Sequence, residues 1–364
     1  MHIGFDARIT YYRHGGISTY VRRLVEALER LDRDNQYTVF HSRKARESLV
    51  TRFRHAKLWT PCHHRLERIA LSVELARFNL DVLHSPDFIP PLRGARHHVI
   101  TVHDLSFLRY PQFLTAESRR YYNGQINPAV RQADHIVAIS EATKTDIVNM
   151  LGVAPDKITV HLLGVDESFK PLPQSELERW RSKLQLPPQY ILFVGTFEPR
   201  KNIRGLLDAY QQLATRLPET PPLVLAGQRG WLFDETMAYI ESLDLGARIQ
   251  WRENVAQEAI AALYNVASLL VMPSFYEGFG FPALEAMACG TVPIVSNRSS
   301  LPEVVGDVGL QINPDDPGAL ADAMEYTFTH PEWMAQMQQA GLERASTFTW
   351  ERTAALVLSV YQSL

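Results

Sequence analysis

Short apolar runs alternate along the chain with longer segments in which apolar residues recur every three or four positions. Short runs of this kind predict buried strands, and the longer period predicts helices. In the first half the predicted strands are HIGFD, YTVFH, VLHS, HVITVHD, HIVAIS and ITVHLLG, with helices expected over residues 17–31, 65–78 and 118–132. In the second half the predicted strands are YILFVG, PLVLAG, IQWREN, LLVMPS and VPIVS, again separated by helical segments.

This alternation predicts an α/β protein with two Rossmann-like, doubly wound parallel-sheet domains. We place a linker near residues 170–188, a proline-containing stretch without an apolar strand. The expected domains are residues 1–170 and 171–347, and an amphipathic helix over about 348–364 is expected to pack back across the first domain. Two such domains facing each other create a central cleft at the carboxyl ends of their strands, where ligands bind in open α/β sheets.

Composition narrows the class of protein. The 364 residues suffice for two domains, and 46% hydrophobic residues supply ordinary cores. A net charge of −3 argues against a nucleic-acid partner. Two cysteines, Cys62 and Cys289, exclude a disulfide framework and favour a reducing compartment. The N-terminal residues do not resemble a signal peptide, and no apolar run is long enough to span a bilayer, so we expect a cytoplasmic protein.

Two glutamates, Glu277 and Glu285, flank a glycine-rich turn in the segment SFYEGFGFPALEAMACG. The turn joins a predicted strand to a predicted helix, and Pro282 suits the first turn of that helix. Backbone N–H groups at such a helix N-terminus favour a phosphate, and Gly278 and Gly280 allow the backbone to approach it closely. Glu285 can accept hydrogen bonds from the two vicinal hydroxyls of a ribose. A plain helix N-terminus stabilised by nearby acids is the alternative.

A second turn, in the segment VGTFEPRKN, places Arg200 and Lys201 directly before a predicted helix. Cations at this end of a helix oppose its dipole and so do not stabilise the helix. Their presence here indicates that they bind an anionic ligand. A solvated basic turn is the alternative. Because this turn and the glycine-rich turn should follow strands of the same sheet, we expect them to share one anionic ligand.

The first half offers weaker candidates. Gly15 and Gly16 directly precede a helix, and His103 follows a strongly apolar strand. Ser85 and Asp87 follow another predicted strand. These positions lie where ligands are expected. An ordinary helix-entry turn explains the two glycines equally well, and a histidine satisfied by its neighbours is the favoured alternative for His103 taken alone.

The adjoining Cys62, His63 and His64 do not predict a metal site. Contiguous ligands cannot all point at one ion, and zinc-type spacing is absent elsewhere. No metal is therefore expected.

Residues 43–68 form a basic region with eight basic residues against Glu47 and Glu67. The basic residues are Arg43, Lys44, Arg46, Arg52, Arg54, Lys57, Arg65 and Arg68. The neighbouring apolar residues are Leu66, Ile69, Leu71, Val73 and Leu75. Together they are compatible with docking on an anionic membrane or a lipid-linked acceptor. A solvated charged face is the alternative.

Taken together, these segments resemble the retaining glycosyltransferases of the group 1 type (family 4), which have the GT-B fold. The resemblance covers essentially the whole chain and is most specific at the E-x7-E pattern from Glu277 to Glu285, followed by AMACGTVPIVS and LPEVVGDVGLQINPDD. It implies that Glu285 binds the nucleotide ribose and that Glu277 binds near the sugar and diphosphate. The donor-binding set that it implies is Gly15, Gly16, Thr196, Arg200, Lys201, Glu277, Gly278, Phe279, Gly280, Phe281 and Glu285.

The resemblance also implies catalytic roles for His103, Glu277, Arg200 and Lys201. Lys201 stands at the family's lysine position. Thr196 stands where the family has an arginine, so Arg200 is expected to replace it. His103 is expected to contact the donor sugar.

The implied reaction transfers a sugar from a nucleotide sugar with retention of configuration and without a metal or other cofactor. We expect a front-face substitution in which the leaving phosphate takes the acceptor proton, so that neither glutamate is a nucleophile. The expected partners are the nucleotide-sugar donor and a glycan or lipid-linked acceptor, with peripheral membrane contact through residues 43–68.

The segment GTFEPRKN resembles that of mannosyl- and related transferases of bacterial surface polysaccharides, so GDP-mannose is the expected donor and a UDP-sugar the alternative. A nucleotide-sugar epimerase and a non-catalytic sugar-nucleotide binder also fit the fold. A dehydrogenase is disfavoured because neither half carries a G-x-G-x-x-G pattern after its first strand.

Overall fold

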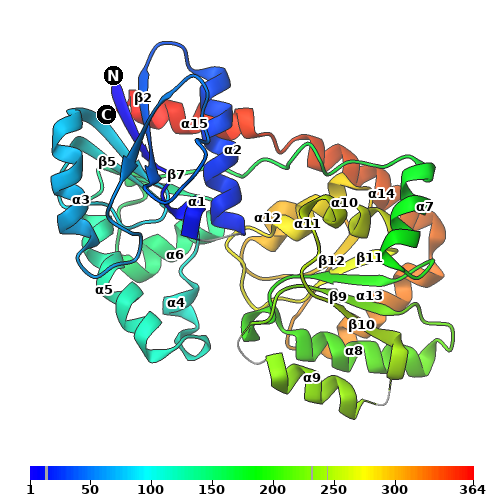
Figure 1. Cartoon of the computed structure of the whole chain (residues 1–364). Coiled ribbons are helices and arrows are strands. Elements are labelled where there is room, and N and C mark those ends of the chain that lie inside the picture. The colour runs from blue at the N-terminus through cyan, green and yellow to red at the C-terminus, as the bar shows by residue number, and fades with distance from the viewer. Residues whose placement is uncertain (13–14, 231–232, 244) are drawn as a thin grey trace. The chain divides into compact units, whose positions relative to one another are not determined.

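The computed structural model describes residues 1–12, 15–230, 233–243 and 245–364 (Figure 1). The chain forms two compact units. Unit 1 consists of Met1–Gly164 and Thr349–Leu364, and unit 2 consists of Val165–Phe348. Each unit has its own parallel sheet, as predicted.

Unit 1 holds a seven-stranded sheet in the order β3-β2-β1-β4-β5-β6-β7. Its strands are β1 (His2–Asp6), β2 (Gln36–Ser42), β3 (Arg54–Leu58), β4 (Leu80–Ser85), β5 (Ala95–Val102), β6 (His135–Ala138) and β7 (Ile158–Val160). The strand order reverses at β1, which pairs with β2 on one side and β4 on the other. The ends of β1 and β4, at Asp6 and Ser85, therefore flank the topological switch point, the place where ligands bind in such sheets.

The helices of unit 1 cover a sheet whose strands β1, β2 and β4 are mostly buried on both faces, which explains their apolar runs. These helices are α1 (Ile9–Tyr12), α2 (Gly16–Leu31), α3 (Glu67–Leu75), α4 (Ser106–Arg109), α5 (Ala116–Gln132), α6 (Glu141–Leu151) and α15 (Trp350–Gln362). Short 3-10 turns span Ala76–Phe78, Pro111–Phe113 and Pro155–Lys157.

Helix α15 returns to unit 1 and packs beside α2, as predicted (Figure 1). It buries Trp350, Val357 and Tyr361. The Tyr361 hydroxyl lies 2.5 Å from Nδ1 of His84 on β4, so α15 reaches the central strands of the sheet.

The basic region of residues 43–68 differs in part from its prediction. Leu71 and Leu75 on α3 are buried in the core of unit 1, so they do not belong to an outward apolar face. The Arg52 guanidinium donates to the backbone carbonyls of Glu29 and Asp32, and Arg68 donates to the carbonyl of Pro90. These two arginines therefore stabilise loops of unit 1 rather than forming a purely solvated charge cluster.

Unit 2 holds a six-stranded sheet in the order β10-β9-β8-β11-β12-β13. Its strands are β8 (Ile191–Val194), β9 (Leu223–Ala226), β10 (Ile249–Arg252), β11 (Leu269–Met272), β12 (Val292–Ser296) and β13 (Leu310–Ile312). Here the order reverses at β8, which pairs with β9 and β11. The loops after β8 and β11 therefore flank the switch point of this unit.

The helices of unit 2 are α7 (Gln174–Leu184), α8 (Ile203–Arg216), α9 (Phe233–Ser242), α10 (Gln257–Val266), α11 (Phe281–Ala288), α12 (Leu301–Val305), α13 (Pro317–Thr329) and α14 (Pro331–Ser346). Short 3-10 turns span Pro199–Lys201 and Gly246–Arg248. The stretch interpreted as a linker, residues 170–188, contains helix α7 within unit 2. Its prolines lie outside the helix, so they did not prevent helix formation.

Candidate active site

The two turns singled out in the second half meet at the switch point of unit 2. The backbone N–H of Phe275, after β11, donates to the carbonyl of Arg200, after β8, at 2.8 Å. Asn202 caps α8 by accepting from the N–H of Gly205, and its Nδ2 donates to the carbonyl of Pro273 at 3.2 Å. Both turns follow strands of the same sheet, as predicted, and these contacts hold the basic turn against the glycine-rich turn.

Glu277 is buried and forms ion pairs with both cations of the basic turn. Lys201 Nζ lies 2.6 Å from Glu277 Oε1, and Arg200 Nη1 lies 2.9 Å from Glu277 Oε2. Arg200 also pairs through Nε with Glu198 at 2.9 Å. Two cations thus converge on one buried carboxylate beside the turn expected to receive a phosphate.

The charges of this group determine its protonation. Burial alone would raise the pKa of the Glu277 carboxyl, but the charges of Lys201 and Arg200 outweigh burial and lower that pKa to about 2. Burial lowers the pKa of Lys201, and Glu277 opposes this effect. Glu277 is therefore ionised at neutral pH, which makes it an acceptor of hydrogen bonds rather than a proton donor.

Two serines support the glycine-rich turn, and the sequence analysis did not identify them. The backbone N–H of Glu277 donates to the Ser299 hydroxyl at 2.9 Å, and the Ser300 hydroxyl donates to the carbonyls of Glu277 and Phe279. Both serines follow β12, which is itself a neighbour of β11. The one feature of the sequence that could have indicated them is their position shortly after the predicted strand VPIVS, at the carboxyl end of the same sheet.

The residues between the two glutamates have different roles. Gly280 precedes α11 with a φ of 112°, a conformation that L side chains rarely adopt, and a Cβ there would lie 2.6 Å from Leu301. The Phe279 side chain is buried and packs against Phe281 and Phe348. Only the backbone of Phe279 is therefore suited to contact a ligand, together with the backbone of Gly278.

Glu285 lies on α11 and has a partner that the sequence analysis missed. The Tyr264 hydroxyl, from α10, donates to Glu285 Oε2 at 2.8 Å. Burial raises the pKa of Glu285 to about 7, and the hydrogen bond from Tyr264 partly opposes this shift. No local pattern links Tyr264 to Glu285, because α10 and α11 are separated by a strand and a loop.

The remaining predicted residues are divided between the units. Thr196 follows β8 in unit 2, and its carbonyl accepts from the N–H of Glu198. Gly15, with a φ of 112°, and Gly16 form the exposed start of α2 in unit 1. His103 Nε2 donates to the carbonyl of Pro86 at 2.7 Å, and burial lowers its pKa, so this histidine is neutral. Its contact with the donor sugar stays a prediction.

Two parallel sheets with switch points, joined by a chain that returns to the first unit, define the GT-B class of glycosyltransferases. Residues 174–344 match the family model described as glycosyl transferases group 1, and residues 14–169 match the one described as glycosyltransferase family 4. The chain belongs to this family.

Curated relatives include the O-antigen chain mannosyltransferase B of Escherichia coli, 35% identical over 78% of this chain and 74% of that protein. The serotype-specific mannosyltransferase WbdA of Escherichia coli is 31% identical over 68% of this chain. That match covers only 31% of WbdA.

Solved structures share the fold at lower identity. Sucrose-phosphate synthase from Thermosynechococcus elongatus is 22% identical, with a TM-score of 0.80 and coverage of 100% of this chain and 98% of that chain. HepE of Anabaena, in a complex with UDP and glucose, is 18% identical with a TM-score of 0.79 and full coverage of both chains. The protein is therefore a glycosyltransferase with the GT-B fold, from a family that uses nucleotide sugars.

Proposed function

We propose that this protein is a retaining, metal-independent mannosyltransferase that uses GDP-mannose and a glycan or lipid-linked acceptor. The observation that carries the proposal is the buried Glu277 with its two cations, Arg200 and Lys201. A diphosphate bound beside these cations would have its negative charge stabilised without a metal ion. Glu277, ionised, would accept hydrogen bonds from hydroxyls of the donor sugar.

The proposed reaction is a front-face substitution. The bond from the anomeric carbon to the diphosphate oxygen breaks, and the acceptor oxygen forms the new bond on the same face. The leaving phosphate oxygen takes the acceptor proton, so the products are the extended glycan and the nucleoside diphosphate. Arg200 and Lys201 stabilise the charge that develops on the leaving group, and Glu285 holds the ribose.

Mannose is favoured as the transferred sugar because the first curated relatives are mannosyltransferases. A UDP-sugar is the second candidate, favoured by the UDP and glucose in the structure of HepE. Membership of a glycosyltransferase family favours sugar transfer to an acceptor over a nucleotide-sugar epimerase or a non-catalytic sugar-nucleotide binder.

Thermal-shift measurements with GDP, UDP, GDP-mannose and UDP-glucose, each with EDTA or with magnesium, test the donor. We expect the melting temperature to rise with GDP and GDP-mannose and to be unaffected by EDTA. A rise only with UDP compounds would support the second candidate, and a rise only with magnesium would contradict the metal-free proposal. NMR of the product formed from GDP-mannose would then report the anomeric configuration.

The proposal includes peripheral contact with an anionic membrane through an outer apolar face of unit 1, formed by Leu66, Ile69 and Val73 near α3 with Trp59 and Leu92. Their exposures are 52%, 56%, 74%, 70% and 50%, respectively. We call these five residues the α3 face. Within the described residues, no helix is long and apolar enough to cross a bilayer.

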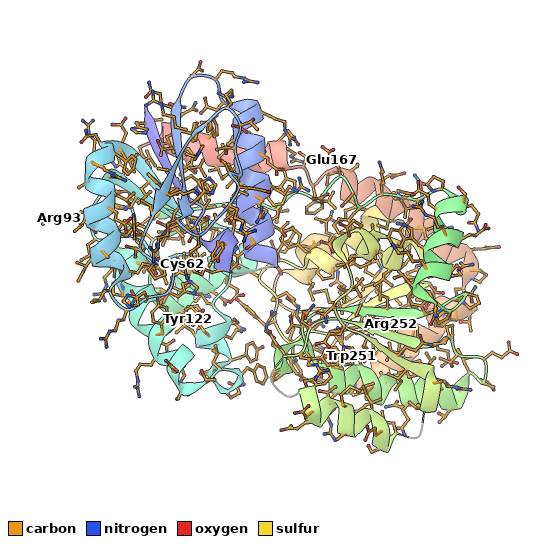
Figure 2. All side chains as sticks on the ribbon, in the orientation of Figure 1. Cys62, Arg93, Tyr122, Glu167, Trp251 and Arg252 are labelled. Carbon is orange, nitrogen blue, oxygen red and sulfur yellow. The ribbon has the colours of Figure 1, made fainter. Side chains whose placement is uncertain are left out.

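Backbone contacts join the three segments of the α3 face. The N–H of Trp59 donates to Glu74 on α3, and the N–H of Leu92 donates to the carbonyl of Arg68. The guanidinium of Arg43 lies 4.3 Å from the Trp59 ring centre, and Arg93 lies beside α3, where its N–H donates to Ser72 (Figure 2). Apolar residues rimmed by arginines fit a surface of anionic lipid head groups.

A further inference from the structure

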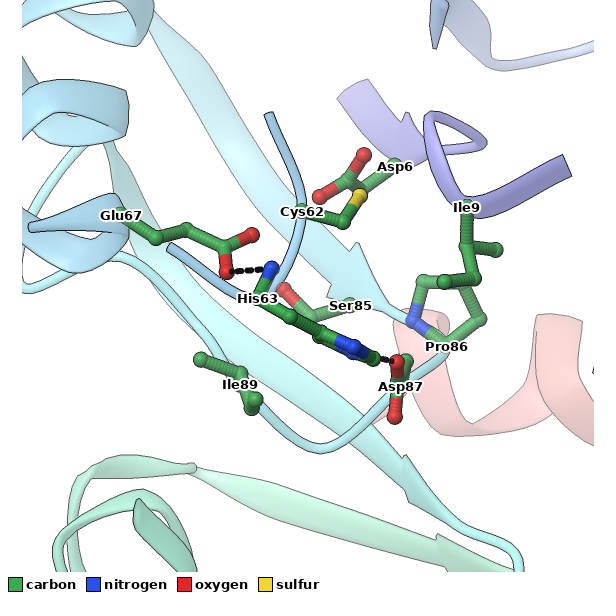
Figure 3. A pocket seen from close by; sticks show the side chains of 9 residues that line it. All are labelled: Asp6, Ile9, Cys62, His63, Glu67, Ser85, Pro86, Asp87 and Ile89. Atoms are coloured by element: carbon green, nitrogen blue, oxygen red, sulfur yellow. Dashed lines mark hydrogen bonds and ion pairs between the residues drawn. The ribbon is translucent and has the colours of Figure 1, made fainter. Parts of the chain in front are cut away.

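The switch point of unit 1 holds a small polar cavity that no step of the proposed reaction uses (Figure 3). Its volume is about 10 Å³, room for about one water-sized group. The polar residues that line it are Asp6, Cys62, His63, Glu67, Ser85 and Asp87. Since Asp6 ends β1 and Ser85 ends β4, the cavity lies where open α/β sheets bind ligands.

Buried Arg8 forms ion pairs with two of the three carboxylates. Its Nη2 lies 2.7 Å from Asp6 Oδ2 and 2.7 Å from Glu67 Oε1, and its Nε donates to Asp6 Oδ1 at 2.8 Å. The other oxygen of Glu67 accepts from the backbone N–H of His63 at 2.6 Å. Asp6 and Glu67 therefore line the cavity with Arg8 paired to both, and Glu67 positions the His63 loop.

The opposite side of the cavity presents a carboxylate and a hydroxyl. His63 Nε2 lies 2.6 Å from Asp87 Oδ2, and because a carboxylate only accepts, this nitrogen carries the hydrogen. The Ser85 hydroxyl is buried and has no hydrogen-bond partner among the described residues. A buried polar group without a partner costs free energy, so its place beside a cavity points to a ligand that supplies the partner.

We propose that this cavity is a subsite for the acceptor, receiving one hydroxyl group of an uncharged sugar that donates to Asp87 and accepts from Ser85. The proposal rests on the proposed function, because it deepens the glycan acceptor of that reaction. His63 orients Asp87 and is a positioning residue.

The chemistry of the cavity selects a hydroxyl over other groups. Three carboxylates against one arginine and a histidine repel an anion. Burial raises the pKa of the Cys62 thiol well above its usual value, so Cys62 is not a thiolate ligand. Within the described part of the chain, no group of three or more His, Cys, Asp or Glu side chains is arranged to hold a metal.

The cavity also adjoins a residue with a predicted catalytic role. His103 Nε2 donates to the carbonyl of Pro86, the residue between Ser85 and Asp87. The short segment from Ser85 to Asp87 that would bind the sugar hydroxyl therefore also orients His103 through the carbonyl of Pro86. This places the subsite within unit 1 next to the position expected to contact the donor sugar.

The test measures binding of mannobiose to the full chain by titration calorimetry, alone and with GDP present. We expect Ser85→Ala and Asp87→Asn to weaken mannobiose binding about tenfold or more, which corresponds to loss of one good hydrogen bond to a charged or buried group. Affinity for GDP should stay within about twofold of wild type in both variants. Asp34→Asn, an exposed carboxylate on a surface turn of unit 1, is the matched control.

Monodeoxy mannobioses identify the bound group. The sugar that lacks the bound hydroxyl should bind weakly to wild type, and Ser85→Ala should not weaken it further. Unchanged mannobiose affinity in both variants, or no mannobiose binding by wild type, would overturn the subsite. Failure of the proposed function is separate, because wild type would then neither bind GDP nor consume GDP-mannose.

Discussion

At the scale of single residues, the buried carboxylate of Glu277 forms ion pairs with both Lys201 and Arg200. Glu277→Gln would remove the negative charge that both cations share, leaving Arg200 paired with Glu198. We expect the free energy of unfolding of unit 2 to fall by about 3 kcal/mol, as for other broken buried ion pairs. Urea denaturation measures this loss.

The same variant should respond more strongly to a nucleotide. GDP supplies negative charge to Lys201 and Arg200. The melting temperature of Glu277→Gln should therefore rise more on addition of GDP than the melting temperature of wild type does. Glu198→Gln is the control, since the Glu198 side chain is partly exposed and its pair with Arg200 is worth less than about 1 kcal/mol. An equal loss of stability in both variants would contradict the special role of Glu277.

The pair of Tyr264 and Glu285 predicts a pH dependence of nucleotide binding. Since the folded-state pKa of Glu285 is about 7, the carboxylate that accepts the ribose hydroxyls forms as pH rises through that value. Nucleotide affinity should rise with it. Tyr264→Phe removes the hydrogen bond that lowers the pKa, so the midpoint should move to higher pH. A rise of one pKa unit corresponds to about fivefold weaker binding at pH 7 and approaches about tenfold at pH values well below 7.

Calorimetric titration of GDP across this pH range in wild type and Tyr264→Phe measures the effect. The ratio of the two dissociation constants cancels the titration of the phosphates, which both proteins share. The ratio should approach one at high pH, where Glu285 is ionised in both. A ratio that is the same at every pH would show that Tyr264 acts by packing alone.

The candidate site could be predicted from the sequence only where its residues share a local pattern. Glu277, Arg200 and Lys201 lie in two short turns after predicted strands, and the structure brings these turns together. Tyr264 and Ser300 are supplied by other elements, and their contacts with Glu285 and the glycine-rich turn depend on tertiary packing. A side chain that acts across two elements leaves no periodic signal in either one.

At the scale of elements, α15 is the structural link that completes unit 1. Tyr361→Phe removes the hydroxyl that pairs with His84 Nδ1 inside the sheet. Leaving a buried polar atom without a partner should lower the free energy of unfolding of unit 1 by about 1–3 kcal/mol. Chemical denaturation followed by near-ultraviolet circular dichroism measures this.

Ser359→Ala on the same helix is the matched control for Tyr361→Phe. Among the described residues, the exposed Ser359 hydroxyl donates to the carbonyl of Leu356 in the preceding turn of α15, so its loss should change stability by less than about 0.5 kcal/mol. If both variants were equally stable, the contact between α15 and the sheet would not contribute.

Most strands were predicted because their apolar runs are continuous, but two were missed. β3 reads RHAKL and pairs only with β2 at the edge of its sheet, with four of its five residues not buried. β13 is three residues long and also lies at an edge. An edge strand forms through backbone hydrogen bonds to one neighbouring strand, so it does not require an apolar sequence. A short polar edge strand therefore shows no hydrophobic pattern from which it could be predicted.

At the scale of the whole molecule, the α3 face predicts where the protein meets a membrane. Ile69→Glu or Val73→Glu should weaken binding to vesicles containing phosphatidylglycerol about tenfold, because one large apolar side chain contributes about 1.5 kcal/mol when buried. Sedimentation with vesicles measures the bound fraction. Leu356→Glu, an exposed apolar residue of α15, is the control and should bind as wild type does. Absence of vesicle binding by wild type would refute the membrane contact.

The division of unit 1 into two chain segments has a consequence for biosynthesis. During translation, residues 1–164 emerge early but lack α15 and the cover that it gives to α2 and β4. Unit 2 emerges next, and its two ends meet where the N–H of Val165 donates to the carbonyl of Phe348 at 3.0 Å. When unit 2 is folded, the two ends of the chain that joins β7 to α15 are already close together. The docking of α15 onto unit 1 then costs less conformational entropy than it would with an unfolded connection of the same length. Unit 2 should therefore fold first. Unit 1, although most of it is synthesised earlier, should complete its native core only after α15 has been made.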